Sequence, residues 1–85
     1  NMKASQAVEA IMKKVGLTKK TLAEKMCSAD KSCNTRLVND RLHQNDITVG
    51  KLDEMVRAMG YKIVIVPDTP ENTDVLKDMG AYRIF

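Results

Sequence analysis

The stretch from Leu17 to Leu42 constrains the fold more than any other part of the chain, because it holds two helix patterns joined by a run of small and polar residues. The first pattern places its apolar residues on one helical face, namely Leu22, Ala23 and Met26. In the second, Val38 and Leu42 lie one turn apart on the inward face, while the outward positions are polar and include Arg36. The stretch therefore predicts one helix that braces a core and a second helix whose polar face is available for contacts.

Length and composition limit the chain to one small domain. With 85 residues and 44% hydrophobic content, it can build one core and little more. The net charge is +3 and the pI about 9.0, and the 14 lysines and arginines are spread along the chain. This mild basicity permits nucleic-acid binding without requiring it. The longest apolar run, Ile63–Val66, is far shorter than a membrane span, and we expect a cytoplasmic protein.

The two cysteines, Cys27 and Cys33, are six positions apart and do not have the C-x-x-C spacing of zinc or redox sites. His43 is the single histidine, so the sequence predicts no metal site and no cofactor. A disulfide between the cysteines is one alternative. Because no secretory signal is visible, we expect free thiols in a reducing cytoplasm.

Helical periodicity on both sides of the opening stretch predicts two further helices. Residues 3–15 have apolar side chains at three- and four-residue spacing, with Ser5 as a candidate cap and Gly16 as the stop. Thr48 is a good N-cap for a fourth helix, which Gly60 ends. The predicted core positions of that helix are Val49, Leu52, Met55, Val56 and Met59.

The segments 16–18 and 22–26 resemble the phage-repressor family (Cro, lambda-repressor and XRE-type proteins) of helix-turn-helix proteins. The later segment 46–60 is also similar to this family, where it closes the core behind the recognition helix. The resemblance covers residues 10–60 and implies a mainly α, four-helix DNA-binding domain over residues 2–60. In that family a small alanine, matched here by Ala23, lets the following helix cross closely.

The chain departs from the family directly after the bracing helix. A glycine and a short turn are usual there, whereas this sequence has Cys27–Lys31. The residues either lengthen the connection or add a turn to one of the two helices. Three N-caps are therefore available to the third helix, which runs to about residue 43: Ser28, Asp30 and Ser32.

The outward face of this third helix, over residues 32–43, supplies the expected contacts with double-stranded DNA. A helix in the major groove brings its N-terminal outward residues to base edges, where Arg pairs with guanine and Asn with adenine. The predicted base-reading residues are Ser32, Thr35, Arg36 and Asn39. The predicted phosphate contacts, which position a protein without reading sequence, are Lys19, Lys20, Lys31, Arg41 and His43. Outside such a setting, an outward Arg or Asn is most often solvated surface.

After Gly60 the sequence period changes to two, and the β-branched and aromatic run 61–66 predicts a strand that Pro67 ends. A lone strand leaves its backbone groups unpaired, so a partner is required. The same strand of a second subunit and the run Ala81–Phe85 are the two alternatives, with one helical turn expected in Asp74–Met79. Residues 61–85 are predicted to be a β extension that forms a homodimer. The predicted dimer contacts are Tyr61, Ile63, Val64, Ile65 and Val66.

These features favour a bacterial or phage transcriptional regulator, of repressor type, over an enzyme. The sequence has no Ser, His and Asp set, no glycine-rich phosphate loop and no evident carboxylate pair. The alternative is a protein-interaction module on the same fold, as in antitoxins, whose C-terminal strand and tail bind a partner protein such as a toxin.

Overall fold

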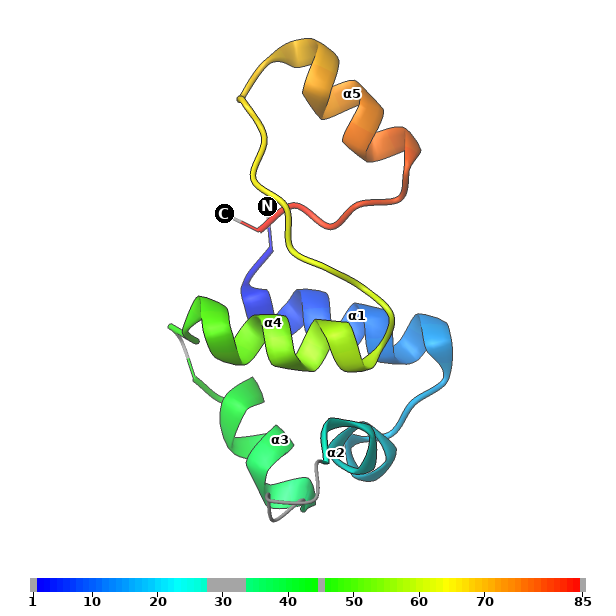
Figure 1. Cartoon of the computed structure of the whole chain (residues 1–85), viewed down its shortest axis with the longest axis vertical. Coiled ribbons are helices and arrows are strands. Elements are labelled where there is room, and N and C mark those ends of the chain that lie inside the picture. Colours follow the sequence, from blue (N-terminus) through cyan, green and yellow to red (C-terminus); the bar gives the residue numbers. More distant parts are fainter. Residues whose placement is uncertain (1, 28–33, 45, 85) are drawn as a thin grey trace.

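The computed structural model describes residues 2–27, 34–44 and 46–84, and these ranges contain five helices (Figure 1). They are α1 (Ala4–Val15), α2 (Lys19–Met26), α3 (Thr35–Leu42), α4 (Val49–Ala58) and α5 (Pro70–Asp78). The predicted mainly helical architecture is confirmed. Helices α1 to α4 pack against one another, whereas α5 stands apart at the opposite end of the molecule from α2 and α3 (Figure 1).

Side chains and glycines at the expected positions end or begin several helices. Gly16 follows α1 with φ of 74°, a left-handed conformation that glycine adopts without steric cost. The Thr18 hydroxyl accepts a hydrogen bond from the Thr21 backbone N–H at 3.2 Å at the start of α2. The Thr48 hydroxyl accepts one from Lys51 at the start of α4. These three predicted boundaries are therefore confirmed.

Two other caps differ from expectation. The N-cap of α1 is Lys3 rather than Ser5, and its backbone N–H donates to Gln6 Oε1 at 2.8 Å. Asn34 caps α3, where its Oδ1 accepts from the Leu37 N–H at 3.0 Å. The predicted caps of α3 were Ser28, Asp30 and Ser32, because Ser and Asp also favour the N-cap position. These three residues lie outside the described residues.

The core lies between α1, α2, α3 and α4, and each of these helices contributes one fully buried large side chain. These are Val8, Leu22, Val38 and Met55. Ala23 is also buried, and it lines a groove together with Asn34 and Thr35 at the start of α3. Val49 was predicted to belong to the core but is 70% exposed, because it is the first residue of α4 and precedes the turn that meets the core.

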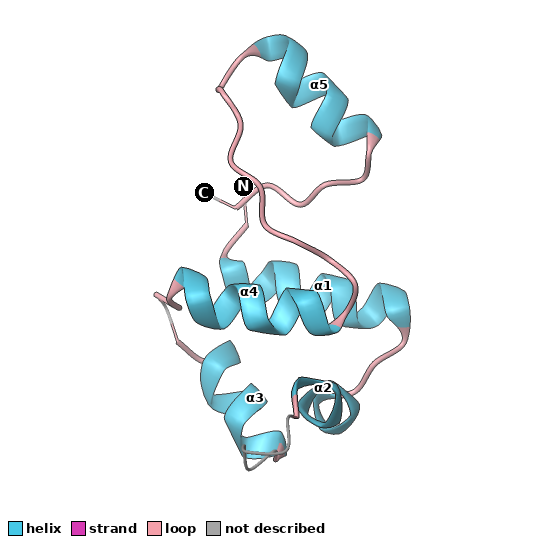
Figure 2. Cartoon of the chain, in the orientation of Figure 1, coloured by secondary structure: helices cyan, strands magenta, loops and turns pink. Residues whose placement is uncertain are grey.

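The predicted strand over residues 61–66 is wrong, because no strand forms within the described ranges (Figure 2). Tyr61 and Ile63 instead pack against the helical core. These two alternating apolar side chains are therefore partly buried by helices and not by pairing with another strand. The rings of Tyr61 and Tyr82 lie 6.3 Å apart between centroids. Near the C-terminus, Met2 and Ile84 form an isolated parallel bridge, and Met2 N–H donates to the Arg83 carbonyl at 3.2 Å.

Helix α5 is longer than the single turn expected in residues 74–79. Pro70 is its first residue, and the Thr69 hydroxyl caps it by accepting from the Asn72 N–H at 3.1 Å. Asn72 Nδ2 also donates to the Pro67 carbonyl at 2.9 Å, which fixes the approach to the helix. No residue of α5 is buried. None of the described helices is long and apolar enough to cross a bilayer.

Candidate nucleic-acid interface

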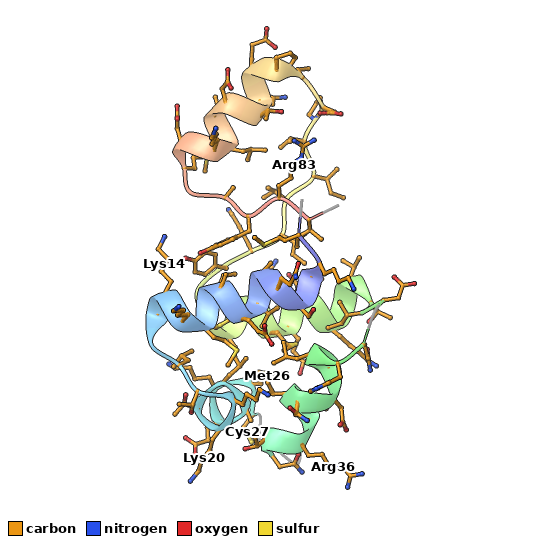
Figure 3. All side chains as sticks on the ribbon, turned by 180° about the vertical axis from the view of Figure 1, so that it is seen from behind. Lys14, Lys20, Met26, Cys27, Arg36 and Arg83 are labelled. Atoms are coloured by element: carbon orange, nitrogen blue, oxygen red, sulfur yellow. The ribbon has the colours of Figure 1, made fainter. Side chains whose placement is uncertain are left out.

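The candidate interface is the surface formed by α2 and by the N-terminal half of α3. Leu22 and Val38, which are fully buried, fix the inward faces of these two helices. Their opposite faces are therefore turned outward, as helical periodicity requires. Figure 3 shows Lys20 on α2 and Arg36 on α3 at the same end of the molecule, with both side chains extending away from the ribbon.

Arg36 and Thr35 occupy the exposed first turn of α3. The Arg36 side chain is 87% exposed, and its Nε lies 3.8 Å from Asp40 Oδ2 on the same helix. An exposed i,i+4 ion pair of this kind contributes little to stability. Breaking the Arg36–Asp40 pair to bind a ligand therefore costs little free energy. The guanidinium of Arg36 is thus accessible to a ligand that offers two acceptors, such as a guanine edge or a phosphate.

Lys19 and Asn39 connect the two helices directly. Lys19 Nζ donates a hydrogen bond to Asn39 Oδ1 at 2.7 Å, and both residues are half-buried. An amide oxygen has two lone pairs, so this bond leaves Oδ1 able to accept a second donor, such as adenine N6. The amide nitrogen of Asn39, Nδ2, carries two hydrogens and can donate one of them to adenine N7. The same bond holds the Lys19 ammonium beside α3.

Arg41 differs from the other predicted phosphate contacts because it is buried, with 8% of its surface exposed. Its Nη1 lies 3.6 Å from Glu54 Oε2 on α4, and neither Nε nor Nη1 has a hydrogen-bond partner in the described part of the chain. The reason is helical spacing: Arg41 follows Val38 by three positions and shares its inward face. The structure therefore places Arg41 between α3 and α4 instead of on the outer surface.

That inward placement could have been found in the sequence. Arg41 lies three positions after Val38, and this spacing predicts an inward side chain, whereas its positive charge alone predicts a phosphate contact. Its partner Glu54 was missed altogether, because pairing between residues on different helices follows from tertiary packing.

The remaining predicted contacts fall into two groups. His43 is exposed just after α3, and its Nδ1 lies 2.7 Å from the Asn39 carbonyl oxygen. Lys31 and Ser32 lie outside the described residues. The structure thus brings five predicted residues to one surface, with side chains that are exposed or half-buried: Lys19, Lys20, Thr35, Arg36 and Asn39.

A shallow groove of about 250 Å³ separates α2 from the start of α3. It is lined by Lys20, Ala23, Glu24, Asn34 and Thr35. The mixture of one cation, one carboxylate and polar side chains gives the groove no strong preference for an anion. The outward side chains, rather than this groove, are therefore the candidate contact residues.

Cys27 follows α2 and is disulfide-bonded, which corrects the expectation of free thiols. Cys33 lies outside the described residues. Within the described ranges, no group of three His, Cys, Asp or Glu side chains is placed to hold a metal ion.

The chain was compared with family models, curated proteins and solved structures, and none of them matches it.

Proposed function

We propose that this chain is a sequence-specific, double-stranded DNA-binding regulator of transcription. In this proposal α1 to α4 form a four-helix, helix-turn-helix domain of the phage-repressor type, and α3 enters the major groove. The base-reading residues are Arg36 and Asn39, assisted by Thr35 and Ser32. Lys19, Lys20, Lys31 and His43 contact phosphates.

The observation that carries the proposal is the shared outward surface of α2 and α3. Arg36 and Thr35 are exposed on the first turns of α3, Asn39 lies one turn further, and Lys19 and Lys20 begin the neighbouring helix. A bidentate donor, an amide and two ammonium groups on adjoining helices are the side chains that base edges and phosphates recognise. Val38, Leu42 and the Arg41–Glu54 pair fix α3 from behind, which supports a rigid reading surface.

The distribution of charge agrees with this assignment. Residues 61–85 contain four acidic and three basic side chains, so the excess of positive charge lies in residues 1–60. The acidic α5 stands at the far end of the molecule from Lys20 and Arg36 (Figure 1, Figure 3). A polyanion is therefore attracted to the α2–α3 end.

Binding to duplex DNA at several salt concentrations tests the proposal. The logarithm of the association constant should fall linearly with the logarithm of salt concentration, since each neutralised phosphate releases counterions. Lys20→Ala should make this slope shallower by about one unit. Lys77→Ala, on the exposed surface of α5, is the matched control and should leave the slope unchanged. Failure of the wild-type chain to bind any duplex, even at low salt, contradicts the proposal.

A second candidate function is a protein-interaction module of the antitoxin kind, and the exposed C-terminal segment favours it. Ile65 is 97% exposed and Met79 is 73% exposed. Exposed patches of large apolar side chains are typical of protein contact sites. Such a module requires a partner protein, whereas the regulator is expected to form a homodimer through residues 61–85. Light scattering on the isolated chain separates them, because a monomer at every concentration favours the interaction module.

A further inference from the structure

Helix α5 presents two adjacent stripes to solvent. Glu71, Asp74 and Asp78 recur at three- and four-residue spacing and are all exposed. Val75 and Met79 are four positions apart and lie beside them, 56% and 73% exposed. We name these five residues the α5 stripe. An apolar row bordered by carboxylates matches an apolar surface bordered by cations.

A surface of that complementary kind is present on the same chain. A groove of about 330 Å³ lies where the ends of α1, α2 and α4 meet. We name it the end groove, and its lining residues are Val15, Leu17, Lys25, Ala58, Met59 and Gly60. Val15 is 42% exposed, and Lys25 is the charged residue of the lining.

Two further cations directly precede Val15, a lining residue of the end groove, in the chain. Lys13 and Lys14 occupy the last turn of α1, immediately before Val15, and both are exposed. The groove is thus lined by apolar side chains and by one cation, Lys25. This is the reverse of the charge on the α5 stripe.

The stripe and the groove lie at the same end of α1. A Cβ placed on Gly80, directly after Met79, would lie 4.0 Å from Lys14 Nζ. Figure 3 shows the labelled Lys14 extending from α1 toward the segment that follows α5. A surface that is acidic and apolar at one end and basic and apolar at the other is self-complementary. Twofold dimers require self-complementarity, because the same surface of both subunits forms the contact.

We propose that the α5 stripe of one copy docks in the end groove of a second copy, and reciprocally, in a twofold dimer. Val75 and Met79 contact the apolar side chains of the groove lining, and the carboxylates of the stripe face Lys25 and the lysines of α1. This inference deepens the homodimer of the proposed function by naming its contact surfaces. It places one half of the dimer contact on α5, at the opposite end of the molecule from α3 (Figure 1), and the other half in the end groove.

Light scattering on the full chain, over a micromolar concentration series, tests the apolar contact. The wild type should dimerise, and Met79→Glu should raise the dimer dissociation constant by about tenfold or more, because a carboxylate placed against the apolar side chains of the lining loses hydration. Val49→Glu is the matched control, since Val49 is 70% exposed on the first turn of α4 and lies outside both surfaces. A monomeric wild type, or equal weakening by both variants, overturns the inference.

A charge exchange tests the polar contact independently. Lys25→Glu and Asp74→Lys should each weaken the homodimer, because each variant opposes like charges at both contacts. Mixing the two variants should restore dimers, since the mixed pair has opposite charges at both contacts. Absence of dimers in the mixture, with both variants folded by circular dichroism, overturns the inference.

The dimer test and the DNA-binding test can fail independently of each other. A monomeric Met79→Glu chain should still bind a single half-site with the wild-type salt slope, because the α2–α3 surface is unchanged. Loss of dimers with retained half-site binding is the expected result. A wild-type dimer that binds no DNA would contradict the proposed function and leave this dimer standing.

Discussion

Lys19 Nζ donates to Asn39 Oδ1 at 2.7 Å, and this hydrogen bond joins the start of α2 to the outward side of α3. One residue of the pair is a predicted phosphate contact and the other a predicted base reader. The hydrogen bond thus links the two residues to which we propose these separate roles. In a shared network of this kind, the effects of two substitutions are not additive.

A double-mutant cycle measures that coupling. Lys19→Ala and Asn39→Ala together should destabilise the fold by about 1 kcal/mol less than the sum of the single changes, since the first substitution already removes the bond. Urea denaturation gives the required free energies of unfolding. The matched cycle uses Lys20 in place of Lys19 and should show additive effects. A coupling energy near zero in the Lys19 cycle would show that the bond does not contribute in solution.

Arg36→Ala should relax base preference at one position of the site, costing about 1 to 3 kcal/mol for the preferred sequence. Its exposed pair with Asp40 contributes little, so stability should hardly change. Lys20→Ala is the comparison, because it should weaken binding to specific and random duplexes alike. Competition binding with single-base variants of the site checks both. An equal loss on specific and random DNA after Arg36→Ala contradicts its base-reading role.

Glu54→Gln should destabilise the fold by about 2 kcal/mol, because it leaves the buried Arg41 guanidinium without its opposing charge. Asp53→Asn is the matched control on the same helix. It removes the exposed Asp53–Arg57 pair, whose Nε–Oδ1 distance is 2.8 Å, and should cost less than about 0.5 kcal/mol. Equal losses in urea denaturation would show that the burial of Arg41 has no energetic consequence.

Two glycine substitutions should change stability in opposite directions. Gly16→Ala should destabilise by about 1 to 2 kcal/mol, because φ is 74° and a Cβ is strained in the left-handed region. Gly50→Ala should stabilise by about 0.5 to 1 kcal/mol, because Gly50 is helical in α4. At both positions an added Cβ meets nothing within 4 Å, so backbone conformation alone sets the sign. Thermal unfolding of both variants checks the prediction, and shifts of the same sign contradict it.

The helices α1, α2 and α4 were predictable because local signals agree at their ends. Gly16 stops α1, Thr18 and Thr48 cap the next helices, and apolar spacing marks the buried faces. The start of α3 was less predictable, since several Ser, Asp and Asn residues compete for the cap. Only the tertiary fold shows that Asn34 fills it.

Residues 61–66 show how packing overrides a strand pattern. Alternating apolar residues predict a strand, but Tyr61 and Ile63 reach the helical core, and no neighbouring segment pairs with their backbone in the described ranges. Helix α5 is longer than the sequence pattern predicts, because its cap Thr69 and its first residue Pro70 are also typical of turns. Helical periodicity in the sequence predicts which residues of the candidate site are exposed. The Lys19–Asn39 hydrogen bond cannot be predicted in this way, because it depends on how α2 crosses α3.

The most direct test of the central claim is selection of bound duplexes from a random DNA pool by the full chain. We expect a single motif to be enriched, with two related half-sites, and Arg36→Ala should lose preference at one base pair in each. Recovery of unenriched sequences by the folded wild-type chain would contradict sequence-specific recognition by α3.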